Sequence, residues 1–371
     1  MTKVLGITFK GFEDIAVLEI KELIKKKATA EKGYILFSAT NEQCASVCYK
    51  TQSLRKIVQL FGEFSFKNFE DFKKQCTALK VDLSILTKKT FKVDCDREGN
   101  HNFTSQEAAA VIGEIFLNQQ PKTKVDLSDS DIIVACIIKE NLCYVGIDYA
   151  GFDLSKREYK IYAQAHMLNA GFAYCALRYA GYSGKEILVD PLCGVGIIPL
   201  EAALFTTHIS PRFHQKNEFK FHNILKIDLS KYDKPIDEKL HITGYDANLR
   251  NVEAAKRQSK LAGVKSINFA RADVEWIDTK AEEKSVDLVI AQAPVEGRAI
   301  PEKDVEKMYK ELFYQLEFVM KDKGKMVFIC QKTAVLKKAL EYFTLVEEHT
   351  AWQGEQEYTL ITVKKKIPTS K

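Results

Sequence analysis

The sequence lacks several features that mark other classes of protein. No apolar run is long enough to span a membrane, and we expect no signal peptide, because Lys3 and Lys10 bracket only a short apolar stretch. No internal repeat or low-complexity tract is present. Nine cysteines are scattered without a Cys-x-x-Cys pair, and Cys44 and Cys48 have no histidine nearby. We therefore expect no metal site, and reduced thiols in a cytoplasmic protein with no membrane partner.

The chain also carries little excess charge. Its 55 Lys and Arg residues against 50 Asp and Glu residues give a net charge of +5. Any surface that binds nucleic acid would therefore have to be local rather than spread over the whole protein. The 371 residues, of which 46% are hydrophobic, are enough to build two or three domains.

Residues 187–196 predict a cofactor-binding turn. An apolar strand runs into an acidic turn that contains Gly194 and Gly196, just before a helix. Glycines let the backbone approach a ligand, and the first turn of the helix points free N–H groups at the same place. Pro199 occupies the position where a Gly-x-Gly-x-x-Gly motif would have its third glycine, which argues against a dinucleotide. S-adenosylmethionine, which contains adenosine but no phosphate, fits better.

Further strands follow in the order that a doubly wound nucleotide site requires. A strand over 240–246 ends at Asp246, whose carboxylate suits the two hydroxyls of a ribose. A strand over 267–270 leads to Asp273, which is placed to accept from adenine N6, and a strand over 286–290 follows. Taken alone, Asp246 is more often a helix cap and Asp273 a solvated turn residue. Their order along the chain favours the cofactor interpretation.

At this point the chain resembles a known family, the class I methyltransferases that carry a THUMP domain and methylate guanine N2 in tRNA or ribosomal RNA. Residues 190–204 resemble the family motif Asp-Pro-x-Cys-Gly-Ser-Gly-Thr-x-x-x-Glu-x-Ala, with Val195 and Ile197 in place of two hydroxyl residues. Residues 208–221 resemble a family insertion. The resemblance implies that the methionine part of the cofactor is surrounded by Asp190, Cys193, Gly194 and Gly196, the ribose by Asp246 and the adenine by Asp273.

The loop after the fourth strand departs from the family, whose members have Asn-(Pro/Leu)-Pro-Tyr there. The aligned residues are Gln292, Ala293, Pro294 and Val295. In the usual motif an amide oxygen and a backbone carbonyl accept from guanine N2, and the tyrosine ring stacks on the base. We expect Gln292 and the Pro294 loop to be catalytic. Gln292 has one more rotatable bond than the asparagine of the motif, so its amide is positioned less rigidly. Val295 has no aromatic ring, so roughly 1–3 kcal/mol of stacking on the base is lost. Tyr309 or Phe313 could replace the ring, unless both belong to the core.

The N-terminal half predicts a separate α/β module. Thr104 and Glu107 have the spacing of a capping box before a helix over 106–117, and strands over 132–138 and 142–148 predict a hairpin. With residues 97–105, this stretch resembles a THUMP domain preceded by a ferredoxin-like domain, and the following domain resembles a Rossmann-like class I methyltransferase. The predicted α/β organisation is a ferredoxin-like domain (1–65), a THUMP domain (66–150), a linker (151–165) and a methyltransferase domain (166–366).

The predicted linker interleaves basic and aromatic residues. We predict RNA contacts by Lys156, Arg157 and Tyr159, and by Arg298 beyond the fourth strand. An alternative of equal weight is a solvated linker whose aromatic residues anchor it to the core.

The sequence thus predicts an S-adenosylmethionine-dependent enzyme that forms N2-methylguanosine in tRNA, with ribosomal RNA as the alternative substrate. A second hypothesis is an RNA-binding or assembly protein that keeps the fold and has lost the reaction, which the changes around Gln292 and Val295 favour. A third is methylation of adenine N6, which uses a similar loop. Whether a small activator subunit takes part is left open.

Overall fold

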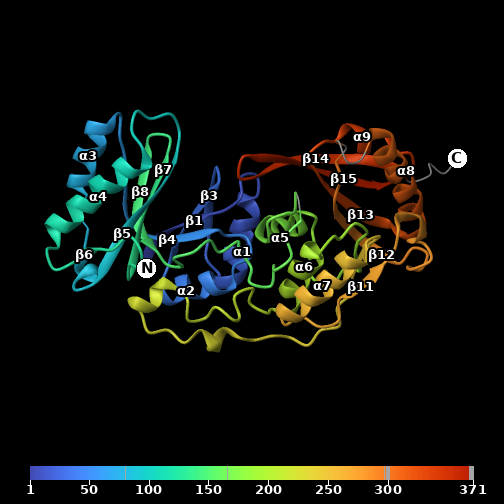
Figure 1. Ribbon diagram of the computed structural model, residues 1–371, viewed down its shortest axis with the longest axis horizontal. Coiled ribbons are helices and arrows are strands. Elements are labelled where there is room, and N and C mark those ends of the chain that lie inside the picture. Colours follow the sequence, from blue (N-terminus) through green and yellow to red (C-terminus); the bar gives the residue numbers. More distant parts are fainter. Residues whose placement is uncertain (80, 165, 296, 298–300, 367–371) are drawn as a thin grey trace. The chain divides into compact units, whose positions relative to one another are not determined.

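The computed structural model describes residues 1–79, 81–164, 166–295, 297 and 301–366. The chain forms two compact units, each built around its own sheet (Figure 1). Unit 1 consists of Met1–Ile7, Glu19–Leu154 and Phe213–Tyr232. Unit 2 consists of Thr8–Leu18, Ser155–Arg212 and Asp233–Lys371.

Unit 1 contains an eight-stranded sheet in the order β2-β3-β1-β4-β8-β7-β5-β6. The strands are β1 (Thr2–Ile7), β2 (Ala28–Glu31), β3 (Tyr34–Ala39), β4 (Lys56–Ser65), β5 (Thr90–Glu98), β6 (Lys124–Val125), β7 (Ile132–Lys139) and β8 (Leu142–Asp148). Antiparallel pairing of β4 with β8 joins the strands predicted for the ferredoxin-like domain to those predicted for the THUMP domain. One continuous sheet therefore runs through both predicted N-terminal domains.

The longer helices of unit 1 follow the sequence pattern. They are α2 (Asn41–Lys50), α3 (Phe69–Ala78), α4 (Ser105–Gln119) and the second half of α1 (Glu13–Ile24), with short 3-10 turns at Leu83–Leu86, Lys220–Asn223 and Leu229–Tyr232. The predicted capping box is confirmed, because Thr104 Oγ1 accepts from the Glu107 N–H and the Thr104 N–H donates to Glu107 Oε2. The predicted hairpin is confirmed as β7 and β8. Figure 1 shows α4 alongside β5, with which it packs.

Unit 2 contains a seven-stranded sheet in the order β11-β10-β9-β12-β13-β15-β14. The strands are β9 (Leu188–Asp190), β10 (Ile242–Asp246), β11 (Asn268–Arg271), β12 (Val286–Gln292), β13 (Met320–Cys330), β14 (Phe343–Gln353) and β15 (Gln356–Lys365). Strands β9 to β13 pair in parallel, and β15 is antiparallel to β13 and β14. The strand order reverses between β9 and β12, and ligands of such sheets bind at the carboxyl ends of the strands at this point.

Helices cover both faces of this sheet. They are α5 (Ala170–Tyr179), α6 (Ile197–Thr207), α7 (Leu249–Leu261), α8 (Glu302–Val319) and α9 (Ala334–Lys338), with a 3-10 turn at Val274–Trp276. Leu188 and Ile290 belong to a core cluster with residues of α5, α6 and α7, whereas Val189 and Val289 belong to a second cluster with residues of α8 and α9. This alternation along β9 and β12 buries both faces of the strands, as a doubly wound sheet requires.

Two short segments belong to the compact unit whose other residues are distant from them in the sequence: Thr8–Leu18 belongs to unit 2, and Phe213–Tyr232 belongs to unit 1. Phe12 packs on Phe172 of unit 2, with ring centroids 5.1 Å apart. Phe221, from the predicted insertion, packs on Tyr149 of unit 1 at 5.9 Å. The compact units are therefore not contiguous along the chain, in contrast with the predicted domains. In the described part of the chain, no helix has both the length and the apolar character needed to cross a bilayer.

Candidate functional site

The loop between β9 and α6 has the backbone that the sequence predicts for a close approach. Gly194 and Gly196 have φ angles of +53° and +85°, which favour glycine. A Cβ on Gly196 would lie 2.8 Å from the Phe269 ring and 2.9 Å from Ala255 Cβ. The loop is thus pressed against β11 and α7 at a place where no larger residue fits.

Asp190 and Cys193 lie in the interior below this loop. The Asp190 side chain is buried, and its Oδ1 accepts from the Leu192 N–H at 3.1 Å. Burial and the neighbouring Asp246 raise the pKa of Asp190 well above its usual range. Burial, with the carboxylates of Asp190 and Asp246 nearby, raises the pKa of the Cys193 thiol as well. Cys193 is therefore a packed thiol and not a nucleophile.

Asp246 ends β10 and binds the loop directly. Its Oδ2 accepts from the Gly194 N–H at 3.0 Å, and its Oδ1 accepts from the Asn248 N–H and from Asn251 Nδ2 at 2.8 and 3.0 Å. Asn248 caps α7, and its side-chain oxygen accepts from the Arg250 N–H. The loop after β9 and the end of β10 are thereby fixed to each other through one carboxylate.

Asp273 follows β11 on the surface. It precedes the turn Val274–Trp276, but its carboxylate makes no capping hydrogen bond there. It lines a cavity of about 460 Å³ together with Arg271, Trp276 and Lys280. Trp276 is 58% exposed and lies in the lining of this cavity. We did not predict this tryptophan from the sequence.

Gln292 ends β12 next to the same loop. It lines a cavity of about 100 Å³ with Asp190 and Cys193, and its Nε2 donates to the His166 carbonyl at 2.6 Å. The carbonyl of Pro294 accepts from the Tyr309 hydroxyl at 2.7 Å. The two predicted catalytic residues are thus held from different directions, Gln292 by His166 ahead of α5 and Pro294 by Tyr309 of α8.

Tyr309 and Phe313 belong to the core. Tyr309 is 1% exposed and Phe313 is fully buried against Phe328 and Phe343. Neither ring is available to stack on a base, so the alternative in which both are core residues is confirmed. Tyr309 instead steadies the loop after β12 through its hydroxyl.

The structure corrects two of the predicted RNA contacts. The Arg157 guanidinium pairs with Glu201 of α6 through Nε–Oε1 and Nη2–Oε2 contacts of 2.8 and 3.0 Å, and the Tyr159 hydroxyl donates to Glu201 Oε1 at 2.6 Å. Both side chains of the ion pair are fully buried. Arg157 and Tyr159 therefore anchor the linker to the core, as the alternative interpretation has it. Lys156 is exposed, and Arg298 lies outside the described residues.

Two amides complete the surroundings of the loop. Gln164 Nε2 donates to Asn251 Oδ1 at 2.6 Å, and Gln164 Oε1 lies 2.8 Å from the position that a Cβ on Gly194 would take. Asn251 could have been found from its place in the first turn of α7, five residues after Asp246. Gln164 carries no such signal, because nothing local shows that the linker reaches the loop.

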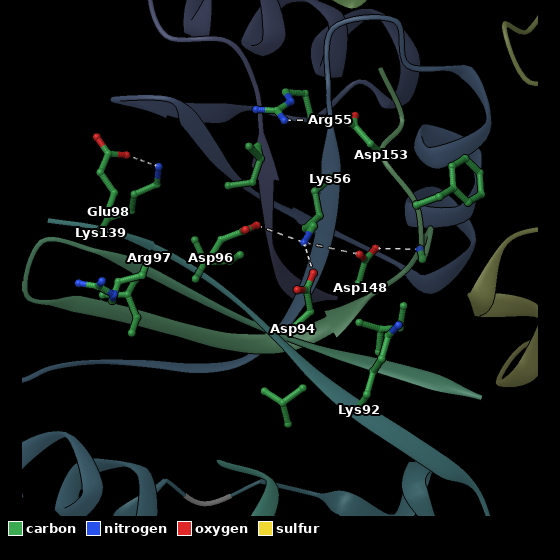
Figure 2. Close-up of a pocket in the computed structure, with 17 residues that line it drawn as sticks. Arg55, Lys56, Lys92, Asp94, Asp96, Arg97, Glu98, Lys139, Asp148 and Asp153 are labelled. Carbon is green, nitrogen blue, oxygen red and sulfur yellow. Dashed lines mark hydrogen bonds and ion pairs between the residues drawn. The ribbon is translucent and has the colours of Figure 1, made fainter. Parts of the chain in front are cut away.

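Unit 1 has a charged cavity of its own, of about 620 Å³. Figure 2 shows Lys56 pointing between three carboxylates. Its Nζ lies 2.8 Å from Asp94, 3.2 Å from Asp96 and 4.0 Å from the buried Asp148. In the same cavity Lys139 pairs with Glu98 at 2.6 Å and Arg55 with Asp153 at 3.5 Å (Figure 2).

Comparison with known proteins agrees with this geometry. The family described as RMKL-like methyltransferase domain matches residues 157–360, more than half of the chain. The chain belongs to this methyltransferase family. The THUMP domain family matches residues 66–148. The predicted class I methyltransferase fold, the THUMP domain and S-adenosylmethionine as the cofactor are therefore confirmed.

Relatives of this RMKL-like methyltransferase include proteins named as RNA methyltransferases. It is 28% identical over 363 residues to the tRNA (guanine(6)-N2)-methyltransferase of Methanocaldococcus jannaschii, covering 93% of this chain and 95% of that one. The enzyme of the same name from Archaeoglobus fulgidus is 25% identical, with coverage of 89% and 83%. The ribosomal RNA large subunit methyltransferase K/L of Vibrio cholerae is 26% identical over 79% of this chain but only 44% of its own length.

Solved structures share the fold along the whole RMKL-like chain. TrmN from Thermus thermophilus superposes with a TM-score of 0.76 at 20% identity, covering 98% of this chain and 100% of that one. The methyltransferase SMU.472, solved as a complex with SAH, has a TM-score of 0.82 at 18% identity, with coverage of 99% and 98%.

Proposed function

We propose that this chain transfers a methyl group from S-adenosylmethionine to the N2 atom of a guanine in tRNA. The observation that carries the proposal is the position of Gln292, which ends β12 and lines the same cavity as Asp190 and Cys193. An amide that accepts from the amine thereby stands beside the residues proposed to hold the methyl donor. The names of the two archaeal relatives and the THUMP domain support tRNA as the substrate.

The residues of unit 2 fit this cofactor. Gly194 and Gly196 let the loop pass close to Gln164, Ala255 and Phe269, where a Cβ would clash, and Asp246 presents a partly exposed carboxylate beside this loop. We propose that Asp246 accepts from the ribose hydroxyls, Asp273 from adenine N6, and that Asp190 faces the methionine ammonium, with Cys193 packing nearby. When bound, the cofactor supplies an electrophilic methyl group on a sulfonium. SMU.472, which shares the fold, was solved as a complex with SAH, which supports S-adenosylmethionine as the cofactor class.

The loop after β12 orients the nucleophile. The lone pair of guanine N2 is delocalised into the ring, so positioning contributes more to the reaction than a base would. Gln292 donates from Nε2 to His166, which directs Oε1 of the same amide away from that carbonyl to accept an N–H of the substrate. The backbone of the Pro294 loop, steadied by Tyr309, accepts the second N–H. Methylation makes the nitrogen acidic, and water or the loop carbonyl then removes the proton.

The competing proposal is a protein that binds RNA without transferring a methyl group. Two observations favour it: neither Tyr309 nor Phe313 replaces the missing stacking ring, and the Gln292 amide is engaged by the His166 carbonyl. Ribosomal RNA is the alternative substrate, which the relative from Vibrio cholerae supports. A transcript of each RNA, assayed side by side, separates these two substrates.

The substitution Gln292→Ala tests the mechanism. It should lower methyl transfer to unmodified tRNA by roughly a hundredfold or more, because the substrate amine loses its acceptor and its alignment. Calorimetric affinity for S-adenosylmethionine should stay within about twofold, since the proposed cofactor contacts are untouched. Gln292→Asn, which restores the residue of the relatives, serves as the matched control and should retain transfer. Full activity in Gln292→Ala would remove this residue from the mechanism.

A further inference from the structure

Unit 2 has a third cavity, of about 830 Å³, whose lining includes none of the residues proposed to contact the cofactor. It lies between the first turns of α7 and the linker around Tyr162 and Gln164. Its lining contains three arginines, Arg250, Arg257 and Arg271, and a single acidic residue, Glu253. We name this cavity the arginine pocket.

Helical geometry explains why the arginines gather there. Arg250, Ala254 and Arg257 follow one another at spacings of four and three along α7, so they share one face of the helix. Arg271 ends β11, and its Nε donates to the Ala247 carbonyl at 3.0 Å. Arg257 Nη1 donates to the Tyr162 hydroxyl at 2.9 Å. Two of the guanidinium groups are therefore oriented by neutral oxygens.

The positive charge of the arginine pocket is only partly compensated by the protein, because three arginines share the lining with one carboxylate, Glu253, whose charge acts on Arg257. Glu253 and Arg257 have the spacing of an ion pair on the helix, but Glu253 is paired with Lys256 at 3.5 Å instead. In the ranges that the structure describes, no carboxylate lies within 4.0 Å of the three guanidinium groups. All three side chains are exposed, so their charges are available to a ligand.

The ligand that fits this surface is a phosphate backbone. Guanidinium groups bind phosphate oxygens through paired N–H donors, and the amides and the tyrosine hydroxyl that line the rest of the pocket are further contacts typical of RNA backbones. We propose that the arginine pocket binds backbone phosphates of the RNA substrate, as an RNA contact of the methyltransferase domain that is separate from the THUMP domain.

The position of the pocket relates this contact to the reaction. It shares Gln164 and Val195 with the cavity at Asp190 and Gln292, and Ala247 and Arg271 with the cavity at Asp273. A phosphate held there lies beside both parts of the proposed cofactor site. The inference rests on the proposed function, because it takes the RNA of that reaction as the occupant.

The test measures affinity for unmodified tRNA by filter binding at several salt concentrations. Arg250→Glu is the first variant, because its side chain makes no hydrogen bond or ion pair that holds the fold in the described structure. Lys260→Glu is the matched control: it is exposed, lies on the same helix and makes the same charge change, but does not line the pocket. Arg271→Gln is a second pocket variant without an added negative charge.

Arg250→Glu should weaken tRNA binding by about tenfold or more and reduce the salt slope by about one, while Lys260→Glu changes both much less. Affinity for S-adenosylmethionine should be the same in all variants. Equal effects of Arg250→Glu and Lys260→Glu, or a wild-type chain that does not bind tRNA, would overturn the inference. Inorganic triphosphate is the other source of phosphate, and binding that depends on Arg250 for triphosphate but not for tRNA would also overturn it.

The two proposals fail in different ways. If wild-type protein binds tRNA through Arg250 but transfers no methyl group, the proposed function fails and the arginine pocket stands as an RNA contact. If transfer occurs and neither Arg250→Glu nor Arg271→Gln alters tRNA affinity, the proposed function stands and the pocket assignment fails.

Discussion

The charged cavity of unit 1 and the arginine pocket of unit 2 contain basic side chains in opposite settings. In unit 1, Lys56 is surrounded by three carboxylates, and Lys139 and Arg55 each face one more. In unit 2, two of the three arginines of the pocket donate to neutral oxygens, and all three side chains are exposed. Both cavities are rich in charge, but the five basic residues that line the first are matched by five carboxylates, whereas the three arginines of the second share its lining with only one, Glu253.

The difference shows that counting basic residues in a cavity does not identify a phosphate site. A lysine among carboxylates neutralises them and stabilises the fold, because an unpaired buried carboxylate is costly. An arginine held by a hydroxyl or a carbonyl keeps its full charge. Whether a basic side chain is paired with a carboxylate, rather than how many basic side chains line the cavity, determines whether it can bind a phosphate.

The largest expected effect concerns an arginine that shares unit 2 with the pocket but is buried. Arg157→Met should lower the free energy of unfolding by roughly 3–5 kcal/mol, since it leaves the buried carboxylate of Glu201 without its counter-ion. Its tRNA salt slope should equal that of the wild type, because the side chain never reaches solvent. Urea unfolding and filter binding measure the two quantities. A reduced slope with normal stability would reverse the structural role assigned here to Arg157.

The next effect tests the unit 1 cavity. Lys56→Met should cost about 3 kcal/mol, because Asp148 loses its counter-ion while its side chain is only 4% exposed. The exposed Arg250→Ala should change the stability by less than about 0.5 kcal/mol. Adding Asp148→Asn to Lys56→Met should recover part of the loss, as measured by a double-mutant cycle of urea midpoints. If Lys56→Met and Arg250→Ala had equal free energies of unfolding, Lys56 would not stabilise the fold more than an arginine of the pocket does.

The smallest effect is a pH dependence at Asp190, a buried carboxyl that faces the like charge of Asp246 rather than a lysine. Burial raises its pKa in the folded state, so the folded protein binds its proton more tightly than the unfolded chain. The resulting stability is fully present below the unfolded pKa, near ~3.9, and is lost as the pH rises through the higher folded pKa.

Asp190→Asn should remove this dependence, so that wild-type stability falls relative to the variant as the pH increases. Urea unfolding at a series of pH values compares the two proteins. Parallel stability curves would show that Asp190 does not change its affinity for protons on folding.

Much of the candidate site could be predicted because its residues follow strands in a fixed order. Asp190, Asp246 and Asp273 come directly after or at the ends of β9, β10 and β11, and parallel strands bring such ends to one edge. The capping box of α4 and the hairpin of β7 and β8 were equally local in sequence. Local sequence patterns are sufficient to predict a feature when the residues that form it lie within one helical turn or one strand.

What the sequence could not reveal depends on distant partners. Arg157 looks like an RNA contact until Glu201, 44 residues away, is placed beside it. Arg257 has the spacing to pair with Glu253, yet its guanidinium donates to Tyr162, which comes from the linker, while Glu253 pairs with Lys256. In each case the decisive atom is supplied by tertiary structure, and the local pattern permits both outcomes.

The discontinuous make-up of the two units has a consequence for the order in which the protein is completed during synthesis. Phe12 leaves the ribosome long before Phe172, on which it packs, and Tyr149 long before Phe221. Domains that are contiguous in sequence can fold one after another as they emerge. Here unit 1 gains its last segment only when residue 232 has been made, so part of unit 2 is already translated before unit 1 is whole. No single cut of the chain would release either unit complete, and both would have to be expressed together.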